Sequence, residues 1–233
     1  MPDRSKSRPV GPDTFDANAH YYPRVPNARL HPLVRHFLTL GNTRIIQRYC
    51  HLHPEATPDA VATVLRTPPR YFRWAGADLF HTATEQGVRR NVVVEINSSP
   101  SGQKSMPLID EDEERGGYRT LLERTLLPML ARRKLPTGGL AVLWDKNEME
   151  VTGYAATLAD LTGEPVHLVY WPPDDPDPQA RFTPDTVLEI RTADGVWIPI
   201  RAAFRYVTQR PWTRIPPLTR TAMLNPVITC LAG

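Results

Sequence analysis

The chain has 233 residues, of which 41% are hydrophobic and 23% are charged, as is ordinary for a globular protein. No run approaches the roughly 18 consecutive apolar residues of a membrane span, and no apolar stretch follows the basic start, so neither a membrane helix nor a secretory signal is predicted. With Cys50 and Cys230 as the two cysteines, a disulfide framework is not expected, and a reducing, cytoplasmic location is predicted.

The net charge of +3 lies in the first 35 residues, which hold six Lys/Arg and three Asp/Glu. The rest of the chain is neutral and has no basic stripe. Nucleic acid is therefore not an expected partner.

The N-terminal part is predicted to be an arm followed by helices. Residues 1–29 are rich in Pro, Asp, Arg and Asn, show no apolar period and predict a flexible arm. Apolar residues recur at helical spacing over residues 30–54, with an interruption at Gly41. A further helix is expected between Thr57, which can cap it, and Pro68, which ends it.

The period becomes that of strands over residues 71–97. Two strand-like runs, YFRWAGADLFHTA and RNVVVEIN, are separated by a segment in which Gly87 suits a tight turn. After an acidic loop, IDEDEERGG, a helical segment is expected over residues 118–135, where Pro128 predicts a kink or a new helix.

The remainder predicts a parallel sheet. LAVLWD, MEVTGYAATLADLTG and PVHLVYW alternate as strand, helix and strand, which is typical of a βαβ unit. A Pro/Asp-rich loop follows. The turn signal at residues 193–195, between two alternating runs, then predicts a β-hairpin.

The run VVVEIN ends in a carboxylate and a carboxamide two positions apart. In a regular strand Val92, Val94 and Ile96 share one face. The other face then carries Val93, Glu95 and Asn97.

If the hairpin turn centres on residues 86–87, Asp78 lies opposite Glu95 on the same face. Two facing carboxylates repel, and a cation between them removes the repulsion. Carboxylate and amide oxygens suit Mg²⁺, so Asp78, Glu95 and Asn97 are the predicted metal ligands. The alternative is that Glu95 and Asn97 form the solvated face of an edge strand, and a register slip of one residue would separate the two carboxylates.

Four stretches resemble one family in their order and spacing: GADLF (76–80), VVVEINSSPSG (92–102), AAFRYVTQRPW (202–212) and NPVITCLAG (225–233). They are similar to the circularly permuted ATP-grasp ligases, namely the eukaryotic-type glutathione synthetases and, more distantly, the glutathionylspermidine synthases. The resemblance covers roughly residues 70–233, and each motif is short.

The resemblance implies functions for individual residues. Glu95 and Asn97 correspond to magnesium ligands with Asp78 as the nearby acid, and Arg205 corresponds to the arginine that binds the substrate carboxylate. The substrate-facing positions implied by the family's loops are Ser98, Ser99, Ser101 and Asn147.

The chain also departs from the family pattern. Gly76 stands where the family has an Arg two residues before the Asp, and Arg73 is the nearest replacement. In the family the ATP-binding lysine, the glycine-rich lid and the last metal carboxylate follow Leu-Ala-Gly, which ends this sequence. Neither G-x-x-x-x-G-K-[ST] nor G-x-G-x-x-G is present.

We therefore expect an α/β protein with a flexible Pro-rich arm (1–29), a helical segment with a metal-site β-hairpin of ATP-grasp type (30–137) and a Rossmann-like pre-ATP-grasp domain (138–233). The expected function is the substrate- and Mg²⁺-binding portion of an ATP-dependent carboxylate–amine ligase, inactive without the half that binds ATP. Its partner would be an amino acid or peptide. The alternatives are a non-catalytic amino-acid or peptide-binding module and a subunit that pairs with a separate ATP-binding chain.

Overall fold

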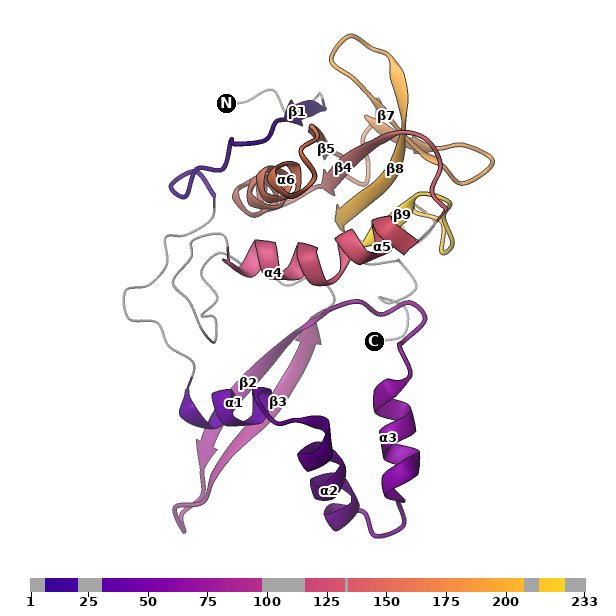
Figure 1. Cartoon of the computed structure of the whole chain (residues 1–233). Coiled ribbons are helices and arrows are strands. Elements are labelled where there is room, and N and C mark those ends of the chain that lie inside the picture. Colours follow the sequence, from indigo (N-terminus) through magenta and orange to yellow (C-terminus); the bar gives the residue numbers. More distant parts are fainter. Residues whose placement is uncertain (1–6, 21–30, 98–115, 133, 208–213, 225–233) are drawn as a thin grey trace.

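A computed structural model describes residues 7–20, 31–97, 116–132, 134–207 and 214–224. The protein is of the mixed α/β type, and it has two visibly different parts (Figure 1). One part is a sheet covered by helices. The other contains three short helices and a long two-stranded hairpin.

The sheet has seven strands in the order β1-β5-β4-β8-β7-β6, and β9 pairs with β8 beside the end of β7. The four mutually parallel strands are β4 (Gly139–Trp144), β5 (Val166–Tyr170), β8 (Trp197–Tyr206) and β9 (Ala222–Leu224). The antiparallel strands are β1 (Arg8–Val10), β6 (Ala180–Phe182) and β7 (Leu188–Arg191).

The predicted βαβ unit is confirmed. Helix α6 (Glu148–Thr162) connects β4 to the parallel strand β5, and it ends at Gly163 in the left-handed conformation with φ 68°. Glycine adopts this conformation without steric cost, which explains the sharp end of the helix. The hairpin between β7 and β8 is also confirmed, with Gly195 at φ 80° in its turn.

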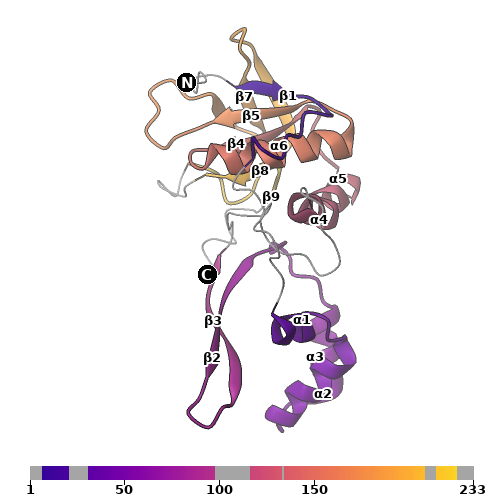
Figure 2. The ribbon, with the colours of Figure 1, turned by 90° about the vertical axis from the view of Figure 1, so that its left-hand side faces the viewer.

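Two apolar layers cover the two faces of the sheet. Alternate residues of β4 enter different layers: Leu140 and Val142 belong to the layer under the helices, and Leu143 belongs to the opposite one. Helices α4 (Gly116–Arg124) and α5 (Leu126–Arg132) lie with α6 on the first face (Figure 2). The break between α4 and α5 falls just before Pro128, as the sequence predicted.

Helix α4 packs closely on α6 at one glycine. A Cβ atom on Gly153 would stand 2.5 Å from the Tyr118 ring, so the two helices meet at a distance that only glycine permits. The Tyr118 ring also meets Tyr154 edge-to-face at 4.8 Å. The hydroxyl of Tyr118 donates to the fully buried Glu150 at 3.3 Å.

The N-terminal segment contains structure that the expectation of a flexible arm over residues 1–29 did not include. Strand β1 adds to the sheet edge beside β5, and Asp13 N–H donates to the Asp160 carboxylate on α6. His20 is buried, and its Nδ1 lies 2.9 Å from the Thr152 hydroxyl. Strand β6, inside the predicted Pro/Asp-rich loop, was likewise not expected.

Helices α1 (Pro32–Leu38), α2 (Asn42–Leu52) and α3 (Pro58–Arg66) match the predicted helices and their breaks. Thr57 caps α3, since its hydroxyl accepts a hydrogen bond from Ala60 N at 3.3 Å. None of these three helices contains a buried residue.

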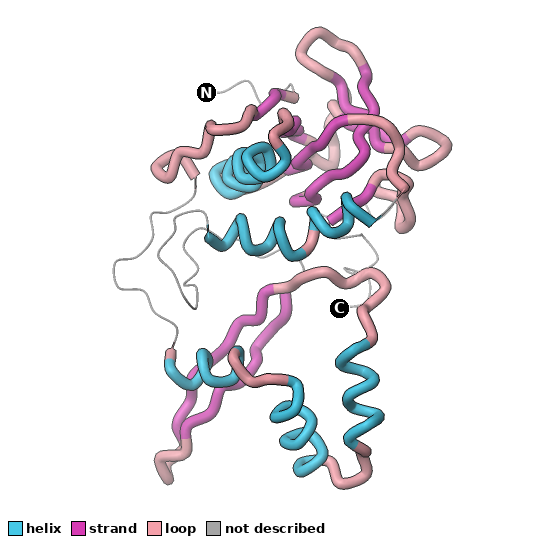
Figure 3. Tube along the Cα trace, viewed as in Figure 1, coloured by secondary structure: helices cyan, strands magenta, loops and turns pink. Residues whose placement is uncertain are grey.

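The predicted hairpin forms from β2 (Gly76–Ala83) and β3 (Arg89–Asn97), and it extends away from the sheet (Figure 3). Its turn contains Gly87 at φ 77°, whose N–H donates to the Thr84 carbonyl at 2.8 Å. Throughout the described ranges, no helix combines the length and hydrophobicity needed to cross a membrane.

Candidate functional site

The base of the hairpin brings together the three predicted metal ligands. Asp78 lies opposite Glu95, and Gly76 lies opposite Asn97. The Asn97 amide donates to the Glu95 carboxylate at 2.9 Å and lies 3.5 Å from the Asp78 carboxylate. We call Asp78, Glu95 and Asn97 the hairpin triad.

The predicted pairing of Asp78 with Glu95 is confirmed, but the register assumed for the rest of the hairpin was wrong, because from Leu79 to Ala83 each partner lies one residue away from the one that a turn centred on residues 86–87 gives. The predicted facing of the valines was wrong as well. A β-bulge between Asp78 and Leu79 places Val93 opposite Leu79 and Glu95 opposite Asp78. Because Asp78 and Leu79 are consecutive and point to opposite faces, Val93 and Glu95 cannot share a face. Val92 lies on the triad's face instead.

The two carboxylates of the triad interact directly. A hydrogen bond shared with Glu95, partial desolvation and the negative charge of Glu95 raise the pKa of Asp78 above its usual value. Asp78 thus holds a proton more readily than an isolated aspartate does. A cation at the same place would replace that proton and reverse the shift.

The chemistry of the triad fits a hard divalent cation. Two carboxylates and one amide supply oxygen atoms only, and Asn97 presents its oxygen if its amide plane rotates by half a turn. Within the described ranges no cluster of three or more His, Cys, Asp or Glu side chains offers a competing metal site.

A second polar group lies at the carboxyl ends of β4 and β8. The chain leaves β4 for α6 and β5 on one side while β8 lies on the other, and such a switch point is where open α/β sheets bind ligands. Asn147 follows β4 in the left-handed conformation, with φ 52°, and its amide donates to the Tyr206 hydroxyl at 3.2 Å.

A buried ion pair lies at the same end of the sheet. Asp145 directly follows β4, and its carboxylate lies 3.3 Å from the Arg214 guanidinium, with both side chains about 5% exposed. The guanidinium also lies over the Trp171 ring, 4.7 Å from its centre. Burial lowers the pKa of Arg214, and Asp145 opposes that shift. We call Asp145, Asn147, Tyr206 and Arg214 the carboxyl-edge group.

Sequence reasoning found only part of this group. Asn147 was predicted, whereas Asp145 and Arg214 were not, although an Asp directly after a buried strand is a recognisable signal. The predicted substrate residue Arg205 is 2% exposed within β8, so it can reach a ligand only if the atoms that cover it move. Ser98, Ser99 and Ser101 lie outside the described residues.

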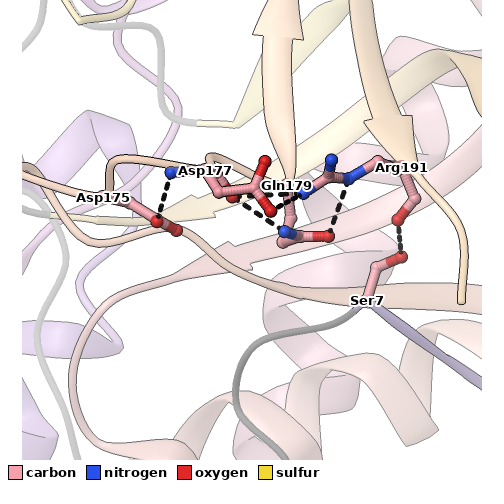
Figure 4. Close-up of polar contacts among 5 residues, drawn as sticks. All are labelled: Ser7, Asp175, Asp177, Gln179 and Arg191. Carbon is pink, nitrogen blue, oxygen red and sulfur yellow. Dashed lines mark hydrogen bonds and ion pairs between the residues drawn. The ribbon is translucent and has the colours of Figure 1, made fainter. Parts of the chain in front are cut away.

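A third polar cluster joins the N-terminal segment to the far end of the sheet (Figure 4). Arg191 pairs with Asp177 at 2.5 Å and donates to the Gln179 side chain at 3.3 Å, while the Ser7 hydroxyl donates to the Arg191 carbonyl. The hydrogen bond from Arg191 lowers the pKa of Asp177. The cluster borders an open cavity of about 380 Å³. Because its side chains bond to one another, we interpret the cluster as a structural contact that holds the two segments together.

Comparison with known proteins gives no family for this chain. No family model matches it, and no curated protein is significantly similar to it.

Proposed function

We propose that this chain is the substrate- and Mg²⁺-binding portion of an ATP-dependent carboxylate–amine ligase of the circularly permuted ATP-grasp type, related to the glutathione synthetases. The observation that carries the proposal is the hairpin triad. Asp78, Glu95 and Asn97 lie together on one face at the base of β2 and β3, which is the arrangement that the family resemblance implies.

In this proposal the triad holds Mg²⁺ through its carboxylate and amide oxygens. The ion supplies neutralisation of phosphate charge during formation of an acyl phosphate. The protein's own contribution is to keep two acidic side chains within reach of each other on a short hairpin. The raised pKa of Asp78 reflects that closeness.

The proposed binding site for the amino-acid or peptide substrate is the carboxyl edge of a Rossmann-like sheet. Asn147 offers an amide there. The Arg214 guanidinium is of a type suited to two-pronged binding of a carboxylate, but it is buried and paired with Asp145, so it requires local opening. Arg205 remains a proposed substrate contact that requires local opening. ATP would be bound by residues other than the described ones.

The metal part of the proposal is tested by Mn²⁺ titration followed by electron paramagnetic resonance, which measures free Mn²⁺. Glu95→Gln is expected to weaken binding at least about tenfold because one of two anionic ligands is lost. Glu85→Gln, at the turn of the same hairpin, is the matched control and should bind like the unmodified protein. Equal binding by the Glu95→Gln and Glu85→Gln variants would remove the triad as a metal site.

The ligase part is tested separately by ADP release from the protein as its source organism makes it. Release is expected only when a carboxylic acid and an amine are both present, and Glu95→Gln should abolish it. ADP release that needs neither substrate would contradict the proposed reaction.

A second candidate function is a binding module that holds an amino acid or peptide without catalysis. The carboxyl-edge group favours it, because Asn147, Tyr206, Asp145 and Arg214 lie at the switch point of the sheet and not at the triad. Ligand binding that is unchanged by a metal chelator and lost in Asn147→Ala would favour this candidate over the ligase.

A further inference from the structure

The hairpin exposes apolar side chains on both of its faces. Phe80, which is 64% exposed, shares a face with Val92, because those two residues lie opposite each other. Leu79 and Val93 form a second exposed pair on the other face, next to Ile96. A two-stranded hairpin in water is marginally stable at best, so this surface calls for a cover.

The outer edge of β3 is open to pairing. Among the described residues β3 pairs only with β2, and its central run from Val92 to Val94 has no Pro and no charged side chain, which are two of the usual means of protecting an edge strand. Charged residues and a β-bulge lie only on either side of that run. β-Branched residues occupy four of the five positions from Val92 to Ile96. Such an edge is a template for another strand.

One end of β3 is basic and the other end is acidic, so two antiparallel copies of the strand would have complementary charges. The strand begins with Arg89 and Arg90, and near its end Glu95 lies beside Asp78. In the described part of the chain Arg89 and Arg90 have no ion-pair partner. If two β3 strands run antiparallel about a twofold axis, the basic start of each meets the acidic end of the other. A parallel arrangement would instead place like charges together.

We propose that the β3 edge pairs in antiparallel fashion with β3 of a second copy of this chain, which forms a four-stranded sheet in the order β2-β3-β3-β2. The valines then lie at the centre of the new sheet, and Arg90 of each copy, which shares a face with Glu95, approaches Glu95 of the other. Arg89 lies on the opposite face and adds positive charge to the same end of the strand. This inference does not depend on the proposed ligase activity. Because Glu95 belongs to both proposals, association is measured in a chelator, without divalent cations.

The test is sedimentation equilibrium of the full chain over a range of concentrations and salt. The expected species is a dimer of twice the 26.3 kDa chain mass that dissociates more readily as salt rises. Replacing Arg89 and Arg90 together by Glu should raise the dimer dissociation constant at least about tenfold through like-charge repulsion. The matched control replaces Arg44 and Arg48 by Glu on the exposed face of α2 and should leave the dimer intact.

A charge swap separates the proposed pairing from any other dimer. Glu95→Arg alone should weaken association, and its combination with Arg89→Glu and Arg90→Glu should restore it. A chain that stays monomeric at about 100 µM overturns the inference. So does a dimer that ignores the arginine changes, or a swap variant that does not recover. Association is read without divalent cations and Mn²⁺ binding is read from the Glu95→Gln variant, so either measurement can fail while the other succeeds.

Discussion

The sheet and the hairpin contain similar apolar residues, which are buried in the sheet and exposed in the hairpin. In the sheet, Phe204 is fully buried and stacks on Tyr154 with ring centres 4.1 Å apart. In the hairpin, Phe80 is 64% exposed. Phe204 and Phe80 both lie in strands, β8 and β2, and the difference is that a second layer of structure covers β8. Helices α4 to α6 supply that layer to the sheet, whereas β2 is met by the His31 ring at the start of α1, 4.1 Å from the His81 ring, and no buried layer is described over the hairpin.

This difference separates stability from association and binding. The sheet part has enough buried apolar surface to fold as a unit. A two-stranded hairpin without a covering layer is only marginally stable. Binding of a second chain to its exposed valines, or of a metal ion to the hairpin triad, would stabilise it. We therefore expect changes in the buried layers of the sheet to act on folding, and changes in the hairpin to act on binding and association.

The largest expected effect comes from truncating the buried aromatic residue. Phe204→Ala should lower the free energy of unfolding by about 3 to 5 kcal/mol, because it leaves a cavity beside Tyr154 and Trp74. The measurement is urea denaturation followed by tryptophan fluorescence.

Phe80→Ala is the matched variant in the hairpin. It should cost less than about 1 kcal/mol in a monomer, because the ring is already largely in water. A cost equal to that of Phe204→Ala would mean that the hairpin is covered in solution. If that cost also rises with protein concentration, the cover is another copy of the chain.

Much of the fold was predictable because its signals are local. Helix α3 has its cap at Thr57 and its stop at Pro68, and the βαβ unit has a strand, a helix with Gly163 at its end and a second strand, all within about 30 residues. Strands β1 and β6 were missed because each has three residues and gains its strand conformation from a neighbour, not from its own pattern.

A loss of stability smaller than that of Phe204→Ala is expected where helices α4 and α6 touch. Gly153→Ala should lower the free energy of unfolding by about 2 kcal/mol, because the new methyl group overlaps the Tyr118 ring. Gly11→Ala is the control, since open space surrounds its missing Cβ. In an isolated helix alanine is the better residue, so a stabilised Gly153→Ala protein would contradict the close contact.

The candidate sites divide in the same way as the fold. A hairpin pairs residues that are close in sequence, so the triad residues could be brought together by prediction, but in the structure Glu95 lies opposite Asp78 because of a β-bulge that left no sequence signal. The pairing of Asp145 with Arg214 could not be predicted, since 69 positions separate the two residues and only the parallel sheet brings them together. Burial of Arg205 depends on the same tertiary packing.

The smallest effect concerns pH and again belongs to the sheet part. Burial within β5 lowers the pKa of His167 below its usual 6.5, so the unfolded chain binds a proton more readily than the folded one. His167 therefore causes no loss of stability above about pH 6.5 and an increasing loss as the pH falls below that value. His167→Gln should flatten this part of the curve of unfolding free energy against pH. The difference between the two curves isolates His167 from other groups such as the buried His20. If the curves of the two proteins run parallel between pH 5 and 7, the His167 ring binds protons equally well in the folded and unfolded chains. That behaviour is expected of exposed side chains such as those of the hairpin, and it would contradict the burial of His167 in the sheet.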